Sequence, residues 1–155
     1  MTTTCPQLIR ASERGEEIRF QHPLNPRSEL HGHLLGRQAG LRRTGVNLAH
    51  IPPGKESFVY HSHEGEEEWI YILSGRGIAE IDGAEHEVGP GDFMGFPAPS
   101  VAHHLCNPFS EELVYLTGGE SREVEIADYP RLGLRLIRTA KGAHVAPLDQ
   151  LRQIG

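Results

Sequence analysis

Glycine and proline residues divide this chain into short apolar runs, and this division most constrains how the chain can fold. The sequence holds 18 Gly and 11 Pro among 155 residues, so turns must be frequent. The apolar runs between them recur roughly every 8 to 12 residues, which favours many short strands over long helices. The pattern predicts an all-β sandwich or barrel.

The clearest local signal is the pair Asp82-Gly83, which stands between two alternating runs. This dipeptide is the preferred two-residue turn of a β-hairpin, so a hairpin is predicted around it. A second sharp turn is predicted at Gly89-Pro90-Gly91-Asp92. Further strands are predicted at residues 31–36, 44–51, 57–63, 68–75, 92–96, 101–107 and 111–118.

The run 68–75 differs from the others because both of its alternating faces are apolar. Ile70 and Ile72 fall on one face, whereas Trp69, Tyr71 and Leu73 fall on the other. A strand that is apolar on both faces is predicted to be central in its sheet.

The chain length fits one domain. Residues 1–30 mix charges with prolines and show no sustained period, so they are predicted to form an N-terminal arm that packs against the domain. Residues 31–120 are predicted to form the β-barrel. Residues 121–155 are predicted to contribute a C-terminal strand or two followed by a surface tail.

The net charge of −6 has the wrong sign for a surface that binds nucleic acid or an anionic membrane, so neither is an expected partner. No stretch approaches the roughly 20 apolar residues that span a bilayer, and the first ten residues lack the pattern of a secretory signal. These features predict a cytoplasmic protein. Its two cysteines, Cys5 and Cys106, are predicted to stay reduced.

Two histidines separated by one residue suggest a metal site. His61 and His63 lie on the same side of the predicted strand 57–63, close enough to share one cation. A turn then returns the chain, and either Glu67 or Glu68 opens the next strand opposite them. One carboxylate can therefore complete the site.

The turn after His63 is strongly acidic, and a divalent cation would relieve the repulsion between its carboxylates. Four of the five residues 64–68 are glutamates: Glu64, Glu66, Glu67 and Glu68. Glu64 and Glu66 are nevertheless predicted to be part of a solvated turn. His31 and His33 form a second pair of the same spacing, but no acidic partner follows, which disfavours a metal there. Predicted surface histidines are His22, His86 and His144.

The wider pattern resembles the two motifs of the cupin superfamily. The first motif, G-x(5,6)-H-x-H-x(4)-E-x(6)-G, is matched by Gly54, His61, His63, Glu68 and Gly75. The second motif, G-x(5)-P-x-G-x(2)-H-x(3)-N, is approximated by Gly91, Pro97, His103 and Asn107. The resemblance covers residues 54–107, about a third of the chain, with the predicted hairpin between the two motifs.

This resemblance implies a double-stranded β-helix, or jelly roll, with a metal inside it. The ligands that it implies are His61, His63, Glu68 and His103. Three imidazoles and one carboxylate suit one divalent transition metal per chain, namely Fe, Mn, Ni, Cu or Zn, and leave two positions of an octahedral ion open. Asn107 is a candidate for holding the local turn.

Two positions leave alternatives open. Pro99 stands where the second motif has glycine, and an extra residue separates it from the histidine, so His104 could replace His103 as the ligand. Only His103 keeps the three-residue spacing to Asn107, and adjacent strand residues face opposite ways. Glu67 competes with Glu68, although only Glu68 keeps six residues before the next glycine of the motif.

Cupins include enzymes of several classes and non-catalytic proteins, so the fold alone does not give the function. A metal-dependent enzyme, dioxygenase-like or isomerase-like, that acts on a small oxygenated molecule coordinated at the metal is predicted, with dioxygenase-like activity favoured. The alternative is a non-catalytic module that binds a metal or a small ligand. Because cupin barrels commonly pair through sheet edges, a homodimer is expected.

Overall fold

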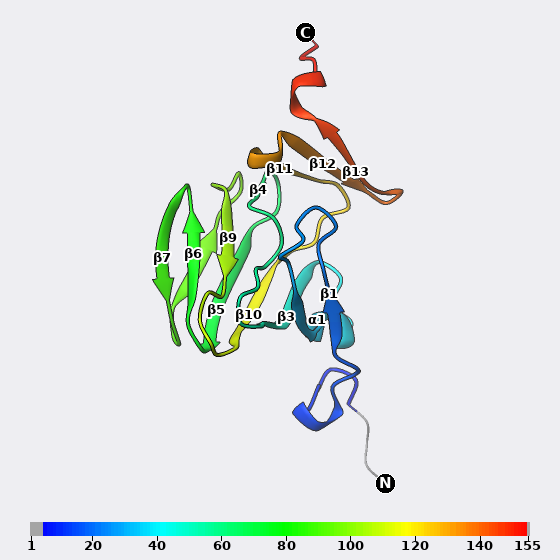
Figure 1. The fold of residues 1–155 in the computed structure, drawn as a ribbon. Helices are drawn as coiled ribbons and strands as arrows, with labels where there is room; N and C mark the ends of the chain where they lie inside the picture. Colours follow the sequence, from blue (N-terminus) through cyan, green and yellow to red (C-terminus); the bar gives the residue numbers. More distant parts are fainter. Residues whose placement is uncertain (1–4, 155) are drawn as a thin grey trace.

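Antiparallel strands dominate residues 5–154, the part of the chain that the computed structural model describes. The all-β prediction is confirmed, and the strands form a jelly roll (Figure 1). A six-stranded sheet has the order β1 (Ile18–Phe20), β2 (Leu30–His33), β3 (Thr44–Ile51), β10 (Leu113–Glu120), β5 (Glu68–Ser74) and β8 (Phe93–Phe96). A three-stranded sheet has the order β7 (Ala84–Val88), β6 (Gly77–Ile81) and β9 (His103–Cys106).

A third sheet has the order β13 (Gly142–Pro147), β12 (Leu134–Thr139), β11 (Glu125–Tyr129) and β4 (Ser62–His63). The short helices are α1 (Leu35–Gln38) and the 3-10 turns η1 (Ala11–Glu13), η2 (Pro130–Leu132) and η3 (Leu148–Gln150). In Figure 1 the C-terminal strands β12 and β13 lie at one end of the molecule, and the segment before β1 lies at the other. None of the helices in residues 5–154 has the length and apolarity needed to cross a membrane.

The hydrophobic core lies between the six-stranded and the three-stranded sheets. β5 and β10 supply Ile70, Ile72 and Tyr115, while β6 and β9 supply Ala79 and Leu105 from the opposite side. β5 pairs with both β10 and β8, so its predicted central position is confirmed. Its outer face is not covered, however, because Tyr71 and Leu73 remain about two-fifths exposed, at 39% and 41%.

The predicted hairpin is formed by β6 and β7, joined by the two residues Asp82 and Gly83. Their φ angles are 50° and 79°, and two successive positive values are what a type I′ turn requires. Asn107 also holds a turn, as expected. Its side-chain amide donates to the carbonyls of Ile51, at 2.8 Å, and Glu111, at 2.7 Å.

Three local predictions are wrong. Residues 57–63 do not form one strand, because the segment crosses between sheets: the amides of Ser57 and His61 bond to β9 carbonyls, whereas His63 pairs with β11. Residues 31–36 form a strand only as far as His33. Helix α1 follows, and a Cβ on its Gly36 would lie 2.9 Å from the backbone nitrogen of Val46, so glycine allows the close packing. The C-terminal segment has three strands rather than one or two.

Candidate metal centre

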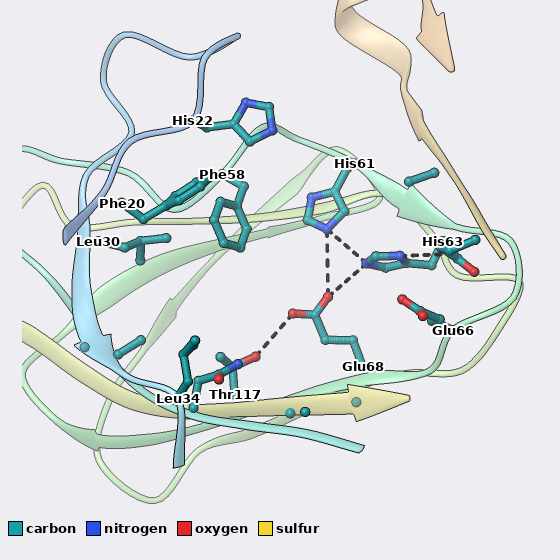
Figure 2. Close-up of a pocket in the computed structure, with 18 of the residues that line it drawn as sticks. Phe20, His22, Leu30, Leu34, Phe58, His61, His63, Glu66, Glu68 and Thr117 are labelled. Atoms are coloured by element: carbon teal, nitrogen blue, oxygen red, sulfur yellow. Dashed lines mark hydrogen bonds and ion pairs between the residues drawn. The ribbon is translucent and has the colours of Figure 1, made fainter. Parts of the chain in front are cut away.

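Three imidazoles and one carboxylate converge inside the barrel. His61, His63, Glu68 and His103 each offer one ligand atom, and these four atoms all lie within 4.8 Å of one another. The Oε2 atom of Glu68 is 3.1 Å from the Nε2 atoms of both His63 and His103, and 3.8 Å from that of His61. Figure 2 shows His61, His63 and Glu68 pointing toward one another.

The backbone fixes where these side chains start. His61 and His103 exchange two backbone hydrogen bonds, of 3.1 Å and 2.8 Å, which clamp the segment before β4 to the first residue of β9. Glu68 begins β5, and alternation places it on the same face as the buried Ile70. The hydroxyl of Thr117 on β10 donates to Glu68 Oε1 at 3.2 Å. The cluster is thus held by strands of all three sheets.

Each of the three histidines has a hydrogen-bond partner at Nδ1, so its Nε2 atom is the one that faces the cluster. The carbonyl oxygen of Val59 lies 2.6 Å from His61 Nδ1, and that of Val101 lies 3.1 Å from His103 Nδ1. A carbonyl can only accept, so each of these Nδ1 atoms carries a proton and donates it, and Nε2 is the nitrogen that each ring turns toward Glu68. In a neutral ring held in this way, the nitrogen that can bind a metal ion is Nε2.

The third histidine is held by a carboxylate. Glu125 on β11 places its Oε1 atom 3.2 Å from His63 Nδ1, and its side chain is only 2% exposed. Carboxylates that hold the outer nitrogen of a metal-ligating histidine orient the ring and raise its basicity. Glu125 was not expected from the sequence, because it belongs to no motif. The signal available was the alternation in residues 125–129, whose buried positions are Glu125, Ala127 and Tyr129.

The electrostatics of the cluster favour a retained negative charge on Glu68. Burial alone would raise the pKa of Glu68, but hydrogen bonds with His103, His61 and His63 hold this pKa well below its ordinary value. Burial likewise opposes protonation of His63, yet the neighbouring Glu68 and Glu125 carboxylates leave its pKa raised. Three nitrogen donors and one anionic oxygen donor fit a divalent Fe, Mn, Ni, Cu or Zn ion.

The alternatives left open by the sequence lie outside this cluster. His104 faces away from it: its Nδ1 is 3.9 Å from the sulfur of Cys106, and its Nε2 is 3.7 Å from a Glu56 carboxylate oxygen. Glu67 is exposed and contributes no atom to the group. The geometry therefore brings together His103 and Glu68 with the two motif histidines. Their role as metal ligands stays a prediction.

A cavity of about 580 Å³ opens beside the cluster, within the size range of small-molecule sites. His61, His63 and Glu68 line it (Figure 2). His103 lies behind them, where its ring stacks on Phe96 with 3.7 Å between the ring centroids. A molecule in the cavity can thus reach the cluster from one side, while the opposite side is closed by core residues.

Two predictions about residues near the cavity are wrong. Glu66 is 6% exposed instead of solvated, because its carboxylate binds the Arg138 guanidinium and accepts a 2.5 Å hydrogen bond from the Arg122 amide. His22 is half-buried and lines the cavity, with its ring centroid 5.7 Å from that of Tyr129. Burial, and to a lesser extent nearby His61, lowers the pKa of His22. His86 and His144 are exposed, and both cysteines are free, as predicted.

Comparisons with known proteins bear on the same part of the chain. A family model described as a cupin domain matches residues 47–118. A crystal structure from Acidithiobacillus ferrooxidans, designated a candidate sugar phosphate isomerase, is 36% identical with a TM-score of 0.92, and the match covers 97% of each chain. No curated protein matches the chain.

Two further crystal structures share the fold. A sugar phosphate isomerase from a cupin superfamily, from Silicibacter pomeroyi, is 24% identical with a TM-score of 0.84, and the match covers 96% of this chain and 97% of that one. A predicted oxalate decarboxylase from Thermotoga maritima is 22% identical with a TM-score of 0.63, and the match covers 74% of this chain and 99% of that one.

Proposed function

Because the chain belongs to the cupin superfamily, we propose that it binds one divalent transition metal through His61, His63, Glu68 and His103 and is a metal-dependent enzyme. Its substrate is a small molecule in the adjoining cavity that offers oxygen atoms to the metal. One observation supports this proposal above all others. Three Nε2 atoms whose rings are anchored at Nδ1 converge with a carboxylate at the wall of a cavity.

A bound divalent ion would act as a Lewis acid that polarises a substrate oxygen. The chain supplies the positioning. Thr117 orients the Glu68 carboxylate, Glu125 orients the His63 ring, and the Phe96 ring fixes the plane of His103.

Isomerase-like chemistry is the reaction class that we favour. The 36% identical protein from Acidithiobacillus ferrooxidans carries the designation of a candidate sugar phosphate isomerase, and its match covers 97% of this chain. A dioxygenase-like reaction would use the same ligand set, and a non-catalytic module would need only the binding. Turnover that is equal with and without oxygen would support the isomerase-like class, whereas turnover that requires oxygen would reject it.

The metal assignment is tested by changing two adjacent carboxylates. Glu68→Gln keeps the size of the side chain but removes its charge and one donor oxygen, so the purified variant should hold far less than one metal per chain. Glu67→Gln is the matched control and should bind metal as the parent protein does. The measurement is elemental analysis together with a competitive chelator titration. Folded parent protein that takes up no transition metal would refute the assignment.

A further inference from the structure

The cavity has two unlike ends, and only one of them belongs to the metal centre. His61, His63 and Glu68 occupy one end, whereas Phe20, Leu30 and Phe58 gather at the other (Figure 2). Phe20 and Leu30 lie outside residues 47–118, and Phe58 lies within them but at no position of the two motifs. The side chains at this end therefore constrain the ligand in a way that the cupin motifs do not.

The second end is apolar and open. Ile18, Phe20 and Phe58 are 47%, 42% and 39% exposed, although they line a concave site. The Phe20 and Phe58 rings meet edge to face with 5.1 Å between their centroids. Exposed apolar side chains that line a cavity gain free energy when a ligand covers them. Tyr129 lines the same cavity and adds a third aromatic ring.

The charges around the cavity oppose an anionic ligand. Among the described residues that line it, Arg138 is the one Lys or Arg, and its guanidinium is already bound to Glu66 and to the Arg122 carbonyl. The cavity is also lined by five carboxylates, those of Glu66, Glu67, Glu68, Glu120 and Glu125. Phosphate sites normally provide unpaired Arg or Lys donors. A phosphate group at this site would meet carboxylates and imidazoles in place of free Lys or Arg donors. The lining histidines are His22, His31, His33, His61 and His63.

We propose that this cavity is specific for a molecule that places a pair of oxygen atoms on the metal and an uncharged apolar or aromatic body against Phe20 and Phe58, and that it discriminates against phosphorylated sugars. The inference rests on the proposed function for the oxygen-binding end. It departs from the sugar phosphate designation of the 36% identical relative, because the apolar wall and the lack of an unpaired Lys or Arg among the described lining residues do not suit a phosphate.

Three hydroxamates that share one chelating head test the inference on the cobalt-loaded protein. Acetohydroxamate carries only the head, benzohydroxamate adds a phenyl ring, and phosphoglycolohydroxamate adds a phosphate. Binding is followed by the visible absorption of Co²⁺ and gives a Kd for each compound. Benzohydroxamate should bind at least about tenfold tighter than acetohydroxamate, the lower range of gains in an apolar pocket. Phosphoglycolohydroxamate should bind no tighter than acetohydroxamate.

Substitutions test which side chains cause the preference for benzohydroxamate. Phe58→Ala and, independently, Phe20→Ala should each bring the ratio of the acetohydroxamate Kd to the benzohydroxamate Kd down toward one. Phe93→Ala is the control, because Phe93 is 64% exposed and lies outside the cavity lining, so this variant should keep the parent's ratio.

Two outcomes would overturn the inference in distinguishable ways. Equal binding of acetohydroxamate and benzohydroxamate, or tightest binding of the phosphorylated compound, would reject the apolar specificity while leaving the metal centre intact. A cobalt spectrum that responds to none of the three compounds would reject the proposed function itself, and the inference with it.

Discussion

The replacement of His103 by alanine is the most discriminating test of the candidate metal centre. His103 and His104 are adjacent in β9, and both are buried, with 3% and 8% of their surfaces exposed. Only His103 faces Glu68, whereas His104 faces Glu56 and Cys106. His104→Ala therefore removes a similar volume from the same strand without touching the cluster.

The expected size of the effect follows from the number of donors. Zinc sites with four protein ligands in small peptides have apparent binding free energies of about 10–16 kcal/mol, so one ligand of four contributes about 2.5–4 kcal/mol. At 1.4 kcal/mol per factor of ten, His103→Ala should weaken Zn²⁺ binding by about 10²–10³-fold. The change exceeds the 10- to 100-fold losses typical of residues that only orient a ligand. His104→Ala should stay within about threefold of the parent protein.

The assay is a competitive titration with a chromogenic chelator at fixed pH, with circular dichroism to show that each variant is folded. Both variants lose a buried side chain, and so a similar loss of thermal stability is expected for each. If His104→Ala were the variant deficient in metal binding, the register of residues 97–107 would be wrong by one. If both variants bound metal as the parent does, the cluster would not be the metal site.

Three further predictions concern Glu125 beside the cluster, Asn107 and the two cysteines. Glu125→Gln should weaken metal binding about 10-fold, by chelator titration, while the metal-free protein stays at least as stable, because a buried carboxylate with one unpartnered oxygen is neutralised. Asn107→Ala should lower the free energy of unfolding by about 2–4 kcal/mol in urea, since it leaves three backbone groups without their partner. Burial, with help from nearby carboxylates, raises the pKa of Cys106 to about 11, so at pH 8 a disulfide reagent should modify it slowly, and Cys5→Ser should remove the fast phase. A single fast phase that persists in Cys5→Ser would contradict this.

Much of the barrel could be predicted because its signals are local. The Asp82-Gly83 turn needs only its own two residues to adopt positive φ angles, and the alternation of residues 44–51 and 77–88 matches the strands observed. Residues 57–63 could not be predicted in the same way. Their backbone partners change from β9 to β11 within the segment, and alternation does not reveal such a change.

The central residues of the site follow from the motif spacing, whereas their supports do not. Glu66 looked like a surface carboxylate because its partner, Arg138, lies 72 positions further along the chain. Glu125 lies 62 positions from His63. Contacts over such separations depend on how the C-terminal sheet packs on the barrel, and this packing cannot be predicted from the local pattern of a single sequence.

Because the two ends of the cavity differ, membership of the cupin superfamily does not identify the substrate. The cupin motifs account for the residues that converge on the metal position, and these belong to the segment 47–118. The opposite wall includes Phe20 and Leu30, which lie outside that segment, and Phe58, which lies within it but at no motif position. Two cupins can therefore share the metal-binding end and differ entirely in the end that selects the ligand. For this chain the selecting end is aromatic and bordered by carboxylates, and this is why ligand selectivity has to be measured on this chain itself and not carried over from a relative.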